Sequence, residues 1–515
     1  MYYLYHDDGY FFYRVSGEYS FHIYHALNIA LGRYLGAFLL TITGWLVESV
    51  ADLNLLRLLC VVQLSLCALF CAHFFRKYLD NQLQAILAAM IIFTLPPFQS
   101  IVSWGSACYL SFTIPFVLLS LYCALETPLG GQWHKNIFHY RVCFAVFFNF
   151  CALCIYPSMS AFYWSMCALV LLSLRRGSPS VWKQSAARLF FNGILSIMIY
   201  GVTFKITQQV FHFPFELKGI YSPYNIATDY LGKMRWFIQE PLFKSLNLFH
   251  IYPTASYAYF FGMVIASAFG VYALKTYARA QGGREKREAL RQLTVNFLMG
   301  IALLFLSFLP NLLAQSNIAF YRCSAGLTSI IAVAFIWSLK KWAGFLPIKI
   351  QSIALTIALA AVSLYALDKC NANILWYRAL PSHLETLYIK NKLQLSNLEE
   401  IRRVHFIRPK YTSMKSLDDE FGTITSHYGG DLLPLVNCLF KEFAKEKGLI
   451  IGFFHINSVT SLVMHIFADP QTLQEVSRYQ VIVSSNEEGE PVKEYDEPMI
   501  LIDMVEFLEL YPYRE

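Results

Sequence analysis

The sequence has little charge for its length. Only 15% of its 515 residues are Asp, Glu, Lys or Arg, whereas 56% are hydrophobic. A soluble domain carries about a quarter of charged residues. With a mean hydropathy of +0.44, the chain is too apolar for an ordinary soluble fold, and the sequence predicts an integral membrane protein.

Several motifs of nucleotide and metal chemistry are also missing. The sequence contains no cysteine–histidine metal pattern, no phosphate-binding glycine loop and no dinucleotide fingerprint. Most of the 12 cysteines lie in apolar runs, where a thiol behaves as a small apolar side chain, and no disulfide is predicted. These absences argue against ATP-driven chemistry.

Apolar runs recur along the chain. A helix needs about 17 to 25 mostly apolar residues to cross a bilayer. Ten runs are predicted to do so: 53–74, 83–98, 109–125, 142–156, 160–174, 189–210, 257–274, 293–313, 320–339 and 348–367. A further run at 26–47 is interrupted by Arg33 and loosened by glycines, so we predict an interfacial or re-entrant helix there.

Lysine and arginine set the expected orientation, because they accumulate in cytoplasmic loops. They are concentrated in alternate loops, and this bias favours two short spans separated at Pro157 over one kinked helix. The first fifty residues, the loop 211–256 and everything after about residue 368 are then extracytoplasmic. An even number of spans would also place the amino terminus outside without an export signal, so we expect one more span before Met1.

Three regions are expected. Residues 1–50 form an acidic extracytoplasmic loop with interfacial helices, 51–368 the transmembrane bundle, and 369–515 a small extracytoplasmic α/β domain. Strands are predicted at 402–409, 479–485 and 497–504, and helices at 429–448 and 505–510. The acidic run 418–420 is typical of a solvated turn.

Two adjacent carboxylates, Asp7 and Asp8, stand out near the start. One interpretation is a polar turn at a frayed terminus. The other is a site at headgroup depth, where partial desolvation raises the pKa of a carboxyl group and suits a general base. Aromatic residues of the type that anchor chains at this depth surround the pair: Tyr2, Tyr3, Tyr5, Tyr10, Phe11, Phe12 and Tyr13.

Basic and aromatic residues could supply the phosphate-binding and sugar-binding part of such a site. Arg14 and Arg33 bring the opposite charge and suit a phosphate, although facing lipid headgroups is an alternative role for Arg33. The loop 211–256 carries side chains suited to a lid over sugar and phosphate, or to an amphipathic helix in the interface. They include Lys218, Tyr221, Arg235 and Trp236. Trp104 is either an interfacial anchor or a sugar-stacking platform.

Four segments carry a resemblance to a known family. They are HDDGYFFYR at Asp7 and Asp8, ALGRYLGAFL at Arg33, LPNLLAQSNIAFYR ending at Arg322, and DEFGTITS at 419–426. With the many-span architecture, they resemble the GT-C superfamily of integral-membrane glycosyltransferases, and most of all the bacterial O-antigen glucosyltransferases of the type II Gtr kind. That family carries a transmembrane helix before the acidic loop, and this sequence departs from the pattern there.

The resemblance implies an inverting glycosyltransferase that moves glucose or another hexose from a polyprenyl-phosphate donor to a cell-surface glycan such as the O-antigen of lipopolysaccharide. It implies a bacterial inner membrane with the site on the periplasmic side. Asp7 or Asp8 would be the base, while arginine would stabilise the phosphodiester leaving group. The implied donor-phosphate residues are Arg322, Arg33 and Arg14, and the implied substrate contacts are Tyr10, Lys218, Tyr221, Arg235 and Trp236.

The same resemblance implies the ligands and partners. They are the polyprenyl-phosphate sugar, the glycan acceptor, membrane lipid, a small flippase and a donor synthase, with no nucleic acid. Because a monophosphate has less charge to neutralise than a pyrophosphate, no obligatory metal or other cofactor is expected.

Other functions stay open. A glycan polymerase or ligase also acts on polyprenyl-linked glycans, and a lipid-sugar transporter also has many spans, although it usually places charged residues near the bilayer midplane. A structural or docking subunit is a third alternative. Arg322 itself is equally typical of a residue that snorkels to the interface.

Overall fold

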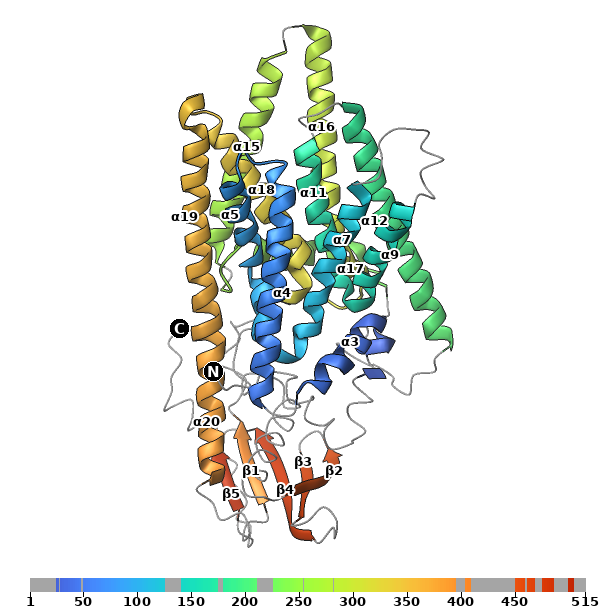
Figure 1. The fold of residues 1–515 in the computed structure, drawn as a ribbon, viewed down its shortest axis with the longest axis vertical. Coiled ribbons are helices and arrows are strands. Elements are labelled where there is room, and N and C mark those ends of the chain that lie inside the picture. The colour runs from blue at the N-terminus through green and yellow to red at the C-terminus, as the bar shows by residue number, and fades with distance from the viewer. Residues whose placement is uncertain are drawn as a thin grey trace.

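The structure, a computed structural model, describes the greater part of the chain. The described residues are 25–26, 28–47, 50–125, 140–174, 179–210, 226–252, 254–280, 282–394, 403–408, 450–458, 461–467, 475–485 and 499–503. They form an upright bundle of helices with a β-sheet at one end (Figure 1).

Eight helices of the described chain are long and apolar enough to cross a membrane. They are α4 (Val50–Arg76), η2 with α7 (Gly105–Phe112 and Thr113–Leu125), α10 with α11 (Pro157–Ser160 and Phe162–Leu174), α12 (Pro179–Val210), α15 (Ala255–Ala278), α16 (Gly283–Leu306), η4 with α18 (Tyr321–Ser324 and Ala325–Ala343) and α19 (Ile348–Ile374). The prediction of a polytopic helical membrane protein is confirmed at this level.

The expected number of ten spans needs correction at two places. The run 83–98 does not form one straight helix, because α5 (Gln82–Phe93) and α6 (Pro96–Ser103) meet at an angle of 65°. Proline at 96 and 97 explains the break, since it has no N–H to donate to a continuing helix. The run 142–156 forms α9 (Tyr140–Ile155), which has 16 residues and is short for a span.

The predicted break before Pro157 is confirmed, whereas the interfacial or re-entrant placement of 26–47 stays a prediction. The helix breaks at Tyr156 before Pro157, as the expected separation of the two runs requires. The run 26–47 contains α3 (Tyr34–Trp45), an apolar helix of 12 residues that is too short to cross a bilayer.

The helices differ strongly in how deeply they are packed. In the most apolar window of each helix, 78% of the η4–α18 residues and 72% of the α10–α11 residues are buried, against 11% in α16. A Cβ on Gly326 of α18 would meet the backbone of Ala161 and Ser307, so glycine allows this close approach. We infer that α11 and α18 form the centre, and that the apolar faces of the outer helices face lipid.

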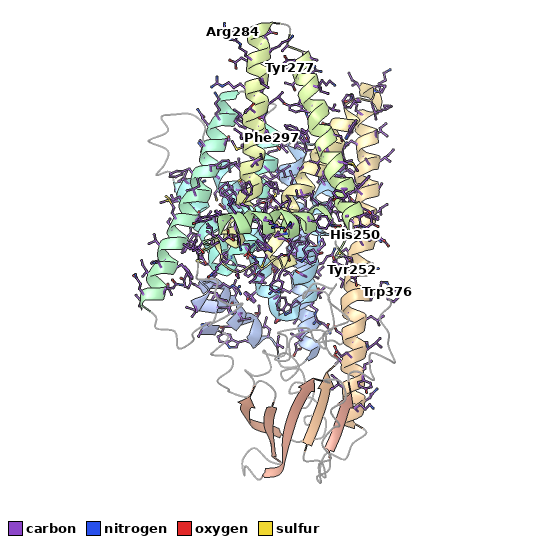
Figure 2. All side chains as sticks on the ribbon, turned by 180° about the vertical axis from the view of Figure 1, so that it is seen from behind. His250, Tyr252, Tyr277, Arg284, Phe297 and Trp376 are labelled. Carbon is purple, nitrogen blue, oxygen red and sulfur yellow. The ribbon has the colours of Figure 1, made fainter. Side chains whose placement is uncertain are left out.

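A run of short helices crosses the upright ones. It consists of α13 (Tyr230–Phe237), the π-helical turn η3 (Ile238–Leu242) and α14 (Phe243–Leu246), and it leads to His250 (Figure 2). The run 293–313 likewise ends early, because α16 stops at Leu306 and α17 (Leu309–Leu313) follows as a separate turn. These elements lie between the long helices and position the loop that precedes η4.

One long helical path joins the bundle to the sheet. α19 continues through the π-helical turn η5 (Leu375–Ala379) into α20 (Leu380–Gln394), which contacts the edge strand β5 (Figure 1). The expected domain boundary at residue 368 therefore falls inside α19.

The sheet has five strands in the order β2-β3-β4-β1-β5. β1 (Arg403–Arg408) lies parallel to both β4 (Glu475–Ser485) and β5 (Met499–Asp503), whereas β3 (Ser461–Phe467) is antiparallel to β2 (Ile450–Ser458) and to β4. The three predicted strands are confirmed as β1, β4 and β5. β2 and β3 were not predicted, and the helices predicted at 429–448 and 505–510 lie outside the described residues.

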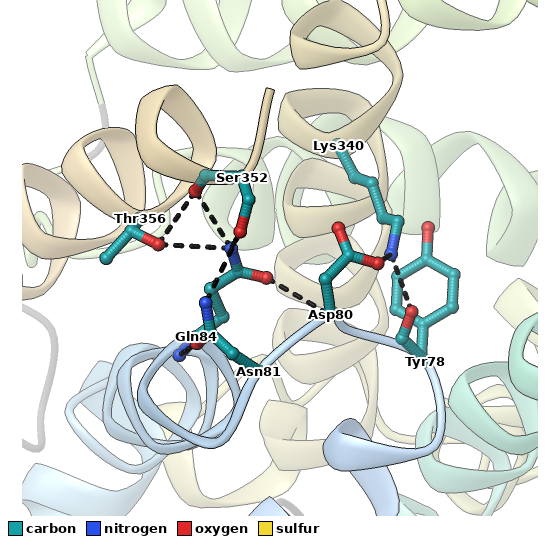
Figure 3. A network of polar contacts seen from close by, with 7 residues as sticks. All are labelled: Tyr78, Asp80, Asn81, Gln84, Lys340, Ser352 and Thr356. Atoms are coloured by element: carbon teal, nitrogen blue, oxygen red, sulfur yellow. Dashed lines mark hydrogen bonds and ion pairs between the residues drawn. The ribbon is translucent and has the colours of Figure 1, made fainter. Parts of the chain in front are cut away.

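The end of the bundle away from the sheet is closed by a polar network (Figure 3). Lys340 of α18 forms an ion pair of 3.0 Å with Asp80 and donates to the carbonyl oxygen of Tyr78 at 2.7 Å. The buried amide of Gln84 donates to the carbonyl oxygen of Ser352 at 3.0 Å and to the hydroxyl of Thr356 at 3.0 Å. These contacts tie the turn between α4 and α5 to α18 and α19.

Candidate functional site

The described residues allow part of the predicted site to be placed. Six of its members lie outside them: Asp7, Asp8, Tyr10, Arg14, Lys218 and Tyr221. Their assigned roles stay predictions. Arg33, Arg322, Arg235 and Trp236 are described, and the site is built from these four.

Arg33 stands at the tight turn that leads into α3. Gly32 has a φ of +73°, and a Cβ there would collide with the hydroxyl of Tyr200, so this turn requires glycine. The turn directs the Arg33 guanidinium over the ring of Tyr156, with its central carbon 4.6 Å from the ring centroid. Nη1 of Arg33 also donates a long hydrogen bond of 3.5 Å to Oδ1 of Asn28.

Arg322 lies in η4, the short turn before α18. Its guanidinium carbon is 4.7 Å from the ring centroid of Trp104 and 4.6 Å from that of Phe320. Both distances are within the range of cation–π attraction. Trp104 is only 5% exposed, so its ring forms part of the packed interior beneath Arg322.

Tyr156 joins the two arginines. Burial raises the pKa of its hydroxyl, and the positive charges of Arg322 and Arg33 both act against this rise. The hydroxyl lies 3.1 Å from Sγ of Cys323, the residue that follows Arg322. Arg33 therefore stacks on a tyrosine whose hydroxyl contacts the residue next to Arg322.

A third arginine lies close to this group. Arg57 of α4 is 8% exposed, its Nε donates to the carbonyl oxygen of Ser103 at 3.2 Å, and its Nη1 donates to Oδ1 of Asn54 at 3.1 Å. Ser103 directly precedes Trp104, and the Arg322 guanidinium stacks on the Trp104 ring. We call Arg33, Arg57, Arg322, Trp104 and Tyr156 the arginine cluster.

Arg57 was not among the predicted site residues, although the sequence contained a signal for it. It is the one Asp, Glu, Lys or Arg between Leu53 and Leu66 of an otherwise apolar helix. Charged residues within apolar helices are costly and commonly mark functional sites. Its link to Trp104 depends on the bend between α5 and α6, which the hydropathy pattern did not show.

Arg235 and Trp236 lie in α13, and no described contact joins them to the arginine cluster. Arg235 is exposed. Nε1 of Trp236 donates to Oε2 of Glu240 at 2.7 Å, and the ammonium of Lys233 lies 4.3 Å from its ring centroid. These two predicted substrate contacts therefore belong to a separate group on the crossing segment.

A histidine follows this crossing segment. The ring centroids of His250 and Tyr257 are stacked 3.6 Å apart, and Nε2 of His250 lies 2.6 Å from the hydroxyl of Tyr365. Burial, with help from the charge of Lys369, lowers the pKa of His250 to about 4. Its imidazole is therefore neutral at physiological pH and links the turn after α14 to α19.

The described residues gather no three His, Cys, Asp or Glu side chains in an arrangement that could hold a metal ion. The expectation that no metal is needed stays a prediction. The arginine cluster instead combines planar cations with aromatic faces. Guanidinium groups match phosphate oxygens in geometry and charge, so the cluster suits an oxyanion.

No family model and no curated protein sequence matches the chain. Among solved structures, one similar chain is the oligosaccharyltransferase of Archaeoglobus fulgidus, crystallised with a tethered acceptor peptide containing the NVT sequon. It is 13% identical, with a TM-score of 0.29 over 72% of this chain and 53% of that one. The chain spans about half the length of that protein, and at this TM-score the likeness establishes neither the fold family nor the activity.

Proposed function

We propose that the protein is a GT-C-type membrane glycosyltransferase that takes a sugar from a polyprenyl-phosphate donor and transfers it, with inversion, to a glycan hydroxyl. The observation that carries this proposal is that Arg33 stacks on the ring of Tyr156, whose hydroxyl lies 3.1 Å from Sγ of Cys323, the residue next to Arg322. Sequence reasoning assigned both arginines to donor phosphate, and they lie on opposite halves of the chain. Their shared position supports one phosphate site.

The cluster fits the leaving group of this reaction. When the bond from the sugar to phosphate breaks, negative charge develops on a phosphate oxygen. Donors that are already oriented toward that charge lower the barrier without reorganising. Stacking on Trp104, Phe320 and Tyr156 restricts the orientations of the two guanidinium groups.

The remaining assignments rest on the sequence resemblance. Asp7 or Asp8 would take the proton of the attacking hydroxyl, and the other would orient the acceptor. Glucose or another hexose would be the transferred sugar and O-antigen the acceptor, on the periplasmic side of a bacterial inner membrane. A small flippase and a donor synthase would supply the donor on that side.

Sugar transfer in membranes tests the proposal. A radiolabelled polyprenyl-phosphate glucose is given to membranes that contain wild type, Asp7→Asn or Asp8→Asn at equal expression, and incorporation into glycan is measured. Loss of one general base is expected to reduce the rate about a hundredfold or more. Normal transfer by both variants would contradict the assigned base.

The size of the product separates the alternatives. A glycosyltransferase adds one labelled sugar to each acceptor site, whereas a polymerase or ligase transfers a preassembled glycan, and a transporter moves the intact donor across the membrane. Mass spectrometry of the acceptor, together with the fate of the donor lipid, distinguishes these products. Intact donor on the opposite leaflet with no modified acceptor would favour the transporter.

A further inference from the structure

The segment 314–320 carries the chain from α17 to η4 and so determines where Arg322 lies. No described backbone hydrogen bond joins two residues of this segment. Its first residue, Ala314, forms an isolated antiparallel bridge with Ile226, and N–H of Ala227 donates to the carbonyl oxygen of Leu313 at 2.9 Å. The segment is therefore held by a different part of the chain.

Two buried lysines from the crossing segment hold the rest of it. Nζ of Lys233 donates to the carbonyl oxygen of Ser316 at 2.7 Å and to Oδ1 of Asn317 at 3.0 Å. Nζ of Lys244 donates to the carbonyl oxygen of Ala319 at 2.8 Å. Lys233 is 6% exposed and Lys244 is 9% exposed.

The environment of Lys233 is unusual for an ammonium group. Within the described chain no carboxylate pairs with it, and its contacts are two neutral oxygens and the ring of Trp236. Burial lowers its pKa to about 8. A desolvated ammonium group is costly unless its N–H groups are satisfied, and here the acceptors come from the segment 314–320.

The residues on both sides of Arg322 are held as well. Nζ of Lys244 lies 4.4 Å from the ring centroid of Tyr321, whose hydroxyl donates to the carbonyl oxygen of Ile251 at 2.8 Å. On the other side, Nδ2 of Asn311 donates to the carbonyl oxygen of Cys323 at 2.9 Å. The backbone of Arg322 thus has fixed neighbours, and Lys244 contacts both the segment and Tyr321.

We propose that Lys233 and Lys244 are positioning residues, which hold the segment 314–320 in the conformation that presents Arg322 to the arginine cluster. The positioning follows from the contacts alone. Its consequence for donor binding rests on the proposed function. The described contacts of the two lysines lead to the segment and to Tyr321, so we infer that both act on Arg322 through them.

Hydrogen–deuterium exchange of the full chain in detergent tests the positioning. Lys233→Met and Lys244→Met keep an apolar stem of similar length but remove the donor. Exchange at the backbone amides of 314–324 is expected to become about tenfold faster or more, because hydrogen bonds to charged groups are among the stronger ones. Lys233→Arg restores donors and is expected to recover part of the protection, while the exposed Lys349→Met serves as the control.

Binding of a polyprenyl monophosphate to the same variants tests the consequence. Each methionine variant is expected to weaken the apparent Kd about tenfold, with less weakening for Lys233→Arg. Unchanged exchange at 314–324 in both methionine variants would overturn the positioning. Faster exchange combined with no binding of the lipid phosphate by wild type would leave the positioning intact and contradict the proposed function instead.

If a methionine variant fails to fold, the same comparison is made with Asn317→Ala, which removes only the side-chain acceptor of Lys233. A smaller rise in exchange, confined to 314–324, is then expected. No change in that variant, with faster exchange spread over the whole chain in the methionine variants, would show a general structural role and overturn the proposal.

Discussion

The two ends of α4 and α18 hold their positive charges in different ways. At one end Lys340 meets the carboxylate of Asp80 (Figure 3), and at the other Arg322 meets the faces of Trp104 and Phe320. A carboxylate neutralises a cation, whereas an aromatic face stabilises the charge and leaves it positive. The described contacts of the first end hold helices together, and those of the second hold the Arg322 guanidinium against aromatic rings.

The largest expected effect is at the arginine cluster. Arg322→Met should reduce sugar transfer about a hundredfold or more, the scale seen when a group that stabilises developing negative charge is removed. Arg322→Lys should recover only part of the rate, because an ammonium group lacks the planar fork of guanidinium. The measurement is initial transfer rate in membranes at equal expression, and a rate within about twofold of wild type would contradict the assignment.

The next largest effect is expected on stability, at the end of the bundle that carries the Gln84 network. Gln84→Leu removes a fully buried amide and, with it, the hydrogen bonds that this amide donates to the part-buried Ser352 and Thr356. The expected loss is about 1–3 kcal/mol, seen as a lower midpoint of thermal unfolding in detergent, with transfer per folded molecule unchanged. The exposed Gln82→Leu on the same helix is the control, and an equal loss in both would show that the network is not responsible.

A pH series sharpens the comparison at Lys233. The pKa of Lys233 is about 8 in the folded protein, below the ordinary 10.5 of a lysine in water, because burial disfavours the charged form. The free-energy cost of burying the charged lysine therefore destabilises the folded protein fully below pH 8. This cost is relieved as the pH rises from 8 toward 10.5. Exchange protection of 314–324, corrected for the intrinsic rate at each pH, should rise over this range.

A variant separates the titration of Lys233 from the titration of the charged groups near it. Asp229, Arg235 and Glu240 lie along the crossing segment, Lys244 follows on α14, and the segment 314–320 itself contains no titratable side chain. Arginine does not titrate below pH 10. Lys233→Arg should thus lose the part of the rise that belongs to Lys233, whereas any part due to Lys244 remains, and protection that falls with rising pH in wild type would contradict the assigned environment.

The smallest effect is expected at the ion pair itself. The side chain of Asp80 is 44% exposed, so solvent weakens its attraction to Lys340. Lys340→Met should cost about 1 kcal/mol or less, and 1 M salt should reduce the difference from wild type further. A greater loss than in Gln84→Leu would show that the charge, and not the buried amide network, dominates this end.

Local patterns predicted much of the fold. Hydropathy located the long helices, and alternation located β1, β4 and β5, because both signals depend on near neighbours in the sequence. The bend between α5 and α6 escaped prediction although Pro96 and Pro97 were visible, since the apolar run continues through them. β2 and β3 escaped prediction because their apolar residues alone do not distinguish a buried strand from a helix segment.

The candidate site was predictable only in part. Arg33 and Arg322 were selected by motif and by position at membrane boundaries, while Asp7 and Asp8 stay predictions outside the described residues. Arg57 had a local signal as a lone charge in an apolar helix. Lys233 and Lys244 had none, because their burial depends on a segment that lies far along the chain.

The sequence by itself determined that this protein is a helical membrane protein with a strand-containing region at its end, because backbone hydrogen bonding in lipid leaves an apolar run few other conformations. Only the tertiary structure decided that Arg33 stacks on a tyrosine that contacts the neighbour of Arg322, and that two lysines hold the segment before Arg322. Charge is encoded residue by residue, but whether a cation meets a carboxylate, a ring or a carbonyl depends on which distant elements pack beside it.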